Sequence, residues 1–92
     1  MTKKETKKIL HLTLKKEWFD LIAKKEKTVE NREIKPYWSK RLEGKTFNEI
    51  HFKNGYAKNA PFMIVKWKGM KKDKQANKYR IQLGKILKIE NY

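Results

Sequence analysis

The stretch that decides the fold runs from residue 9 to residue 33 and reads ILHLTLKKEWFDLIAKKEKTVENRE. Its first part places leucine at every second position, at 10, 12 and 14. Because successive side chains of a strand point to opposite faces, this alternation predicts a strand that is buried on one face.

The period then changes from two to that of a helix. Trp18, Leu21 and Ile22 have the i, i+3, i+4 spacing of one helix face. This predicts an amphipathic helix over residues 16–25 whose apolar stripe, with Trp18 in the core, packs against a sheet. The β-branched residues that follow predict a second strand over residues 27–33.

The rest of the chain reads as further short strands separated by turn signals. Pro36 starts a short helical turn that Gly44 closes. Strands are predicted over residues 46–53 and 61–68, joined by the turn former Asn54-Gly55, and Trp67 is predicted to be a core residue.

The C-terminal third combines a lysine-rich segment with a last strand. Residues 69–78, GMKKDKQANK, read as a loop, which either follows a phosphate backbone or is mobile and solvated. A final alternating strand follows over residues 79–89. Gly84 interrupts it, which indicates a bulge or bend.

These elements predict an α+β fold. We expect a small mixed β-barrel of about five strands, with one main amphipathic helix and a short helical turn. A chain of 92 residues has room for one small core, so we expect a single domain over residues 9–92 after a flexible basic segment, residues 1–8.

Charge is the strongest compositional feature. The chain has 25 lysines and arginines against 10 acidic residues, a formal net charge of +15. This favours acidic partners, with nucleic acid ahead of an anionic membrane surface. Only three of the basic residues are arginines, and a lysine excess is also typical of a surface that is merely well solvated.

Several classes of protein are not expected. No apolar run approaches the roughly 20 residues of a membrane-spanning helix, and no secretory signal is visible. The sequence has no cysteine, so it has neither disulfides nor a thiolate site. His11 and His51 read as isolated structural residues, so we expect no metal and no cofactor. We therefore expect an intracellular, cytoplasmic protein.

Three charged residues form the main candidate site. Glu30 and Arg32 lie two apart, so they share a face of the predicted strand, and Lys27 lies at its start. Their convergence at one end of a sheet would make a polar site. The competing interpretation is an ion-pair network on a solvated strand, which contributes little.

Here the sequence resembles the ASCH domain family, a member of the PUA-like β-barrel group. That family is marked by Gly-x-Lys-x-x-Glu-x-Arg after its first helix, and this chain has Lys27, Glu30 and Arg32 at that spacing, with Lys25 in place of the glycine. The surrounding text, including LTLKKEWFDLIAKKEKTVENREIKPYWSKRL, HFKNGY and YRIQLGKIL, is similar to short bacterial and bacteriophage ASCH proteins. The resemblance covers residues 10–91.

The resemblance implies a barrel with a cleft lined by the three motif residues. Most ASCH domains are proposed to bind RNA, and a minority are enzymes, among them an amidohydrolase that deacylates modified cytidine and a reported ribonuclease. The amidohydrolases use a threonine nucleophile where this chain has Glu30 and a carboxylate from a later strand, which residues 63–67 lack. If the chain is an enzyme, Lys27 and Glu30 are the catalytic candidates, but we expect binding without catalysis.

Aromatic and polar residues extend the candidate site. Lys35, Tyr37 and Trp38 follow the motif closely, and exposed aromatics among lysines are stacking surfaces for unpaired bases. For Trp38, a place in the core is an equally good interpretation. A second lip to the cleft is predicted from Lys53, Asn54, Tyr56 and Lys58. Turn chemistry at Asn54-Gly55 is the favoured alternative.

The leading hypothesis is an RNA-binding or nucleotide-binding module that uses a basic cleft. The first alternative is a small hydrolase that acts on a modified nucleoside or RNA. The second is a protein-interaction module of phage origin that binds an acidic partner.

Overall fold

The computed structural model describes residues 7–92 of the chain. Within this range the elements follow one another in the order β1 (Ile9–Thr13), α1 (Lys16–Ala23), β2 (Val29–Glu33), α2 (Pro36–Leu42), β3 (Glu49–Lys53), β4 (Phe62–Asp73) and β5 (Lys78–Glu90). This is the α+β composition that the sequence predicts.

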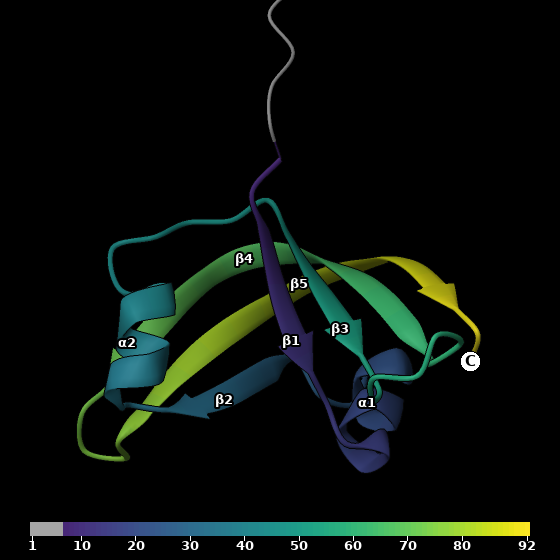
Figure 1. The fold of residues 1–92 in the computed structure, drawn as a ribbon. Helices are drawn as coiled ribbons and strands as arrows, with labels where there is room; N and C mark the ends of the chain where they lie inside the picture. The colour runs from purple at the N-terminus through teal and green to yellow at the C-terminus, as the bar shows by residue number, and fades with distance from the viewer. Residues whose placement is uncertain (1–6) are drawn as a thin grey trace, which may run out of the picture.

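All the strands belong to one sheet, in the order β1-β3-β4-β5-β2. β1 pairs with β3 in parallel, and the remaining pairs are antiparallel. The sheet curls into half a barrel, with α1 and α2 at opposite ends of it (Figure 1). Because β1 and β2 are the two edges of the sheet, the barrel is open between them.

The core lies on the inner side of this curl. The alternation predicted for the first strand is confirmed, because Leu10, Leu12 and Leu14 are buried. Other strands contribute with the same period of two, and both helices add apolar side chains: Phe19, Ile22, Leu42, Ile50, Phe52, Met63, Val65, Tyr79, Ile81 and Leu83. Trp67 and Trp38 are partly buried and pack against this core.

The prediction that Trp18 is a core residue is wrong. α1 ends at Ala23, and the face that it turns to the sheet carries Phe19 and Ile22. Successive helix residues are rotated by about 100°, so with Phe19 directed inward Trp18 lies on the flank of α1. Its side chain is 44% exposed.

The segment predicted as a short helical turn is a seven-residue helix, α2, and Gly44 follows it with a left-handed φ of 69° as expected. A buried tyrosine holds this helix against the sheet through hydrogen bonds. The hydroxyl of Tyr79 on β5 lies 2.6 Å from the Ser39 hydroxyl and donates to a Glu43 carboxylate oxygen at 2.6 Å. α2 is therefore held against the end of the sheet through polar contacts as well as through buried Leu42.

The prediction of a lysine-rich loop over residues 69–78 is wrong. β4 continues to Asp73, and the turn that follows is confined to residues 74–77. The added ladder pairs Gly69 through Asp73 with Lys78 through Gln82 on β5. Lys71 and Lys72 are consecutive and both exposed, so this part of the strand lacks the alternation of buried and exposed residues by which a strand is recognised in a sequence.

The bulge expected at Gly84 is present. Trp67 pairs with Leu83 and Val65 with Ile86, so three residue steps on β5 oppose two on β4. A Cβ atom at Gly84 would lie 2.9 Å from the Lys66 carbonyl oxygen, which explains the glycine.

The predicted flexible segment, residues 1–8, lies mostly outside the described residues. Lys7 and Lys8 are described, and both are attached to the start of β3. The Lys7 amine pairs with Glu49 at 3.0 Å, and the Lys8 amide donates to the Asn48 side chain at 2.8 Å. Neither helix within residues 7–92 is long and apolar enough to cross a membrane.

Candidate functional site

The structure brings together the three motif residues. β2 turns Glu30 and Arg32 to the inner side of the sheet, as the alternation predicts, and the loop after α1 supplies Lys27. An Arg32 Nη2 atom lies 2.8 Å from Glu30 Oε2, and Lys27 Nζ lies 3.6 Å from Glu30 Oε1. The competing interpretation, a solvated surface network, does not describe this arrangement, since Glu30 is only 6% exposed.

The geometry indicates that Glu30 orients the two cations beside it. Each of its carboxylate oxygens faces a different cation. Because Glu30 is buried, water would not fully replace either contact if it were lost. These contacts are those of a carboxylate that orients its two cationic neighbours.

Arg32 also spans the opening of the half-barrel. Its Nη2 atom donates to the Thr13 carbonyl oxygen at the end of β1, at 3.2 Å. β1 and β2 are the unpaired edges of the sheet, so this guanidinium joins the two edges. Its Nε atom is buried and has no partner among the described residues.

Aromatic rings flank both cations. Lys27 Nζ lies 5.5 Å from the centre of the Trp18 ring, and the Arg32 guanidinium lies 4.9 Å from the Trp38 ring. These separations are within the range of cation–π attraction. The two rings come from different helices, α1 and α2, so the folded chain places one aromatic on each side of the pair of cations.

Further ring and cation contacts follow along α2. Tyr37 meets Trp38 edge to face at 4.8 Å, and the Arg41 guanidinium lies 3.6 Å from the centre of the Tyr37 ring. Tyr37 remains 52% exposed. We call the complete set the cation–aromatic cluster; its members are Trp18, Lys27, Glu30, Arg32, Trp38, Tyr37 and Arg41.

Sequence reasoning missed two members of this cluster. Arg41 lies four residues after Tyr37, which is the spacing of neighbours on a helix, and this signal was available. Trp18 had no comparable signal, because its spacing to Leu21 and Ile22 fits a buried stripe equally well. Only the rotation of α1 about its axis distinguishes the two placements.

Other predicted site residues lie apart from the cluster. Lys35 pairs with Glu33 at 3.8 Å on the exposed end of β2. Asn54 donates to the Leu14 carbonyl oxygen at 2.9 Å, which joins the ends of β3 and β1. Gly55 has a φ of 99°, in agreement with the turn-chemistry interpretation at that residue.

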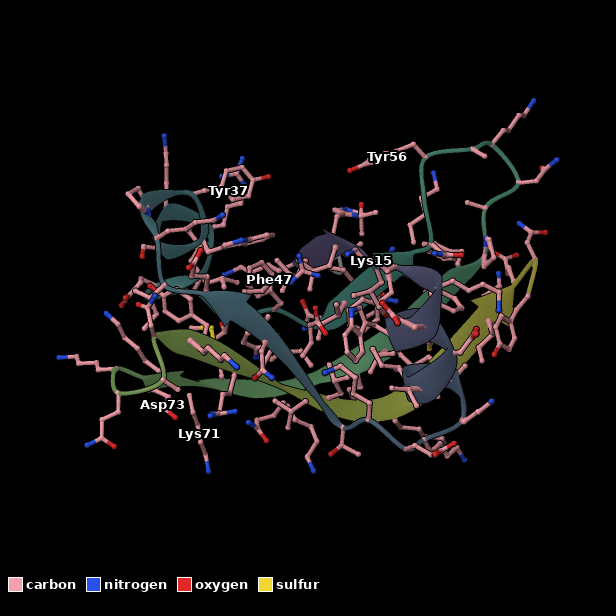
Figure 2. All side chains as sticks on the ribbon, turned by 90° about the horizontal axis from the view of Figure 1, so that it is seen from below. Lys15, Tyr37, Phe47, Tyr56, Lys71 and Asp73 are labelled. Carbon is pink, nitrogen blue, oxygen red and sulfur yellow. The ribbon has the colours of Figure 1, made fainter. Side chains whose placement is uncertain are left out.

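The predicted second lip belongs to β3 and to the loop that follows it. Lys53 is exposed at the end of β3, and Tyr56 is exposed on the loop. Seen from below, Tyr56 and Tyr37 lie on the same side of the molecule, on separate elements (Figure 2). The second lip stays a prediction.

The two histidines are neighbours, against the expectation that each is isolated. His11 on β1 pairs with His51 on β3, and the rings meet edge to face at 5.3 Å. His51 Nε2 lies 3.1 Å from Glu49 Oε1. Hydrogen bonds from His51 and then Lys7 hold the pKa of the Glu49 carboxyl below its usual value. Residues 7–92 contain no group of three or more candidate metal ligands.

Comparisons of the chain with protein-family models, with curated proteins and with solved structures give no match.

Proposed function

We propose that this chain is an RNA-binding module of the ASCH, PUA-like group, and that it binds unpaired nucleotides at the cation–aromatic cluster. One observation carries the proposal: three aromatic rings lie against cations at the side of the sheet where α1, β2 and α2 meet, and two of them, Trp18 and Tyr37, are exposed. Trp18 and Tyr37 offer open ring surface on which bases would stack, at about 1–3 kcal/mol per base. Lys27 and Arg32 lie between them to meet phosphate or base acceptors.

The balance of charge supports an anionic ligand. Lys27 and Arg32 carry two positive charges against the single negative charge of Glu30, and Arg41 adds a third positive charge on α2. The whole chain carries +15, which would draw a polyanion to the surface before any specific contact forms.

Recognition fits these residues better than turnover. A general base needs a lone pair directed at the proton that it removes. Both oxygens of Glu30 face cations instead, one at 2.8 Å and the other at 3.6 Å. The place of the amidohydrolase nucleophile is taken by this same residue.

Binding would be tested by fluorescence polarisation with labelled single-stranded RNA and with an RNA hairpin, over a range of salt concentrations. We expect tighter binding to the single strand and an affinity that falls with added salt as counterions are released. Trp18→Ala and Tyr37→Ala should each weaken binding by about 1–3 kcal/mol.

Tyr92→Ala is the matched control, since it removes an exposed tyrosine at the C-terminus, which lies at the other end of the sheet from α2 (Figure 1). The proposal fails if micromolar protein binds no RNA in a salt-sensitive way, or if Tyr92→Ala costs as much as Tyr37→Ala. Incubation with acylated cytidine and RNA, followed by mass spectrometry, tests the hydrolase alternative. Product that disappears in both Lys27→Ala and Glu30→Ala would favour the enzyme.

A further inference from the structure

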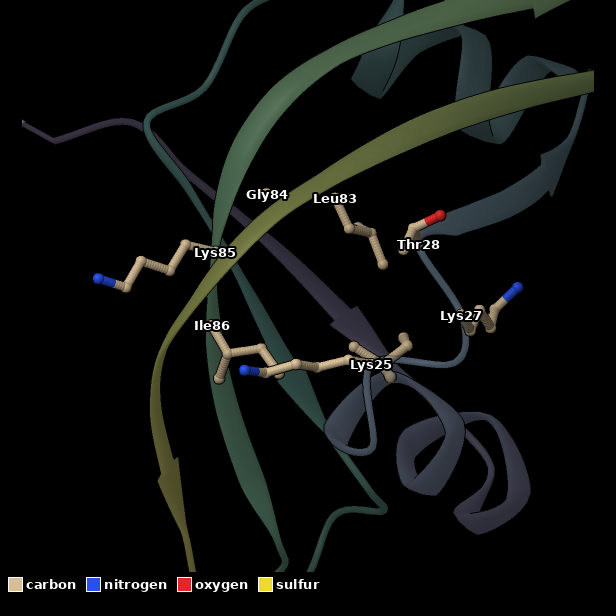
Figure 3. Close-up of a pocket in the computed structure, with 8 residues that line it drawn as sticks. Lys25, Lys27, Thr28, Leu83, Gly84, Lys85 and Ile86 are labelled. Atoms are coloured by element: carbon tan, nitrogen blue, oxygen red, sulfur yellow. The ribbon is translucent and has the colours of Figure 1, made fainter.

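A cavity next to Lys27, between the C-terminal end of α1 and β5, is a second candidate site. It has a volume of about 290 Å³, and its floor consists of Ile22, Leu83 and Ile86. Lys25 and Thr28 stand at its mouth, and Lys85 also lines it, with a side chain that extends away from α1 (Figure 3). None of the residues that line it is acidic.

The β5 bulge creates the apolar floor. Leu83 and Ile86 are three residues apart, so in a regular strand they would point to opposite faces. The extra residue between them on β5 brings both to the same side. The bulge at Gly84 therefore supplies two neighbouring aliphatic side chains, and Ile22 of α1 adds the third.

The end of α1 shapes the mouth. Lys25 has a left-handed φ of 65°, which turns the chain sharply after the helix. Its side chain runs across the mouth towards Ile86, while Lys85 extends outward from β5 (Figure 3). The helix carbonyls of Leu21 and Ile22 accept hydrogen bonds from the amides of residues 25–27, which satisfies these acceptors at this end.

The charges at the mouth are of one sign. Lys25 and Lys85 are exposed, and neither forms an ion pair within residues 7–92. Lys27 also lines the cavity, but its amine is engaged by Glu30 at 3.6 Å. Glu26 follows Lys25 in the chain without lining the cavity. An apolar floor below two cations is complementary to an anion that carries an apolar body.

We propose that this cavity binds a small carboxylate with a compact apolar body, such as a six-carbon fatty acid. The tail lies on Ile22, Leu83 and Ile86, and the carboxylate meets Lys25 at the mouth, with the charge of Lys85 nearby on β5. A nucleobase fits less well, because the aliphatic floor offers no partner for its polar edge. The volume is close to the lower end of small-molecule sites, about 300 Å³, which favours a short ligand. The site does not depend on RNA binding by the cation–aromatic cluster.

The test is a titration of the protein, labelled at its isoleucine and leucine methyl groups, followed by NMR. Hexanoate should shift the methyl signals of Ile22, Leu83 and Ile86. It should bind about 15-fold more tightly than butanoate, at about fourfold per buried methylene. Hexanol, which has the same tail and no charge, should bind more weakly. Cytidine monophosphate should leave these signals in place.

Two sets of variants complete the test. Replacing both Lys25 and Lys85 by glutamine should weaken hexanoate binding by about two- to fivefold per lysine. The matched control replaces Lys45 and Lys58, exposed lysines of other loops, and should leave the affinity unchanged. Thr28→Phe puts a ring at the mouth from an exposed position and should abolish binding.

Four results would overturn the inference: hexanol that binds as tightly as hexanoate, an equal loss in the control pair, full affinity in Thr28→Phe, or larger shifts with cytidine monophosphate. A failure of RNA binding elsewhere would leave this site intact, because the hexanoate titration contains no RNA.

Discussion

Replacing Glu30 by glutamine tests the central element of the site. The substitution keeps the size of the side chain but removes the negative charge that faces Arg32 at 2.8 Å and Lys27 at 3.6 Å. Two cations are then left together beside the core without a counter-charge. We expect a substantial loss of stability. A buried charge whose partner is removed still has the free-energy cost of leaving water, but no longer the attraction to an opposite charge that offset it.

The magnitude follows from the burial of the three groups. Removing one partner of a fully buried ion pair costs about 3–5 kcal/mol. The side chains of Arg32 and Lys27 keep 17% and 19% of their surface exposed, so water relieves part of the cost. We therefore expect a loss of about 2–3 kcal/mol, which for a domain of this size lowers the melting temperature by about 10–20 °C.

A double-mutant cycle isolates the Glu30–Arg32 interaction. Urea unfolding would be followed for Glu30→Met, for Arg32→Met and for the double variant. Because apolar side chains can replace a buried pair at little cost, the double variant should be more stable than either single one, with a coupling of about 1.5–3 kcal/mol.

Glu33→Gln is the control, since Glu33 is an exposed glutamate of the same strand whose lysine partner is 3.8 Å away. It should change stability by less than about 0.5 kcal/mol. If Glu30→Gln costs no more than this control, or if the two methionine substitutions are additive within about 0.5 kcal/mol, Glu30 does not organise the cluster.

Three further predictions concern the scaffold. Gly84→Ala should destabilise the protein by about 1–3 kcal/mol in thermal melts, because the new Cβ would lie 2.9 Å from the Lys66 carbonyl oxygen; an unchanged melting temperature would contradict this contact. Lys25→Gly should stabilise by about 0.5–1 kcal/mol in urea, since the left-handed φ of 65° strains a lysine more than a glycine; a loss of stability would show that the lysine side chain matters more. The hydrogen bond from Lys72 lowers the pKa of the Glu43 carboxyl below 4.5, so the folded state binds fewer protons there than the unfolded state. That contribution to stability is complete above about pH 5 and is lost as the pH falls through the folded pKa. Unfolding of Glu43→Gln at a series of pH values should therefore show a deficit at neutral pH that disappears in acid, and a deficit that persists in acid would refute the assignment.

Much of the site was predictable because local backbone geometry decides it. The two-residue spacing of Glu30 and Arg32 places them on one face of any strand, and the structure confirms that they meet. Lys25 has a left-handed φ of 65° at the end of α1, a conformation that glycine adopts with less strain than lysine.

The parts that sequence reasoning missed depend on how whole elements pack. Trp18 lies beside the cluster and outside the core, because α1 is rotated so that Phe19 faces the sheet. The outer half of β4 was mistaken for a loop, because its strand conformation comes from the ladder with Lys78 through Gln82.

By itself, the sequence determined the period of the first strand and of the helix that follows it, the alternating core positions of β1 and the excess of positive charge. These properties depend on neighbours a few residues apart, whose relative directions the backbone dictates. Only the tertiary structure decided that rings from α1 and α2 flank the cations of β2, and that a bulge opposite β4 aligns two aliphatic residues of β5 over a cavity. Such arrangements depend on the rotation of a helix about its axis and on the pairing of distant strands, and many combinations of these are compatible with one local pattern.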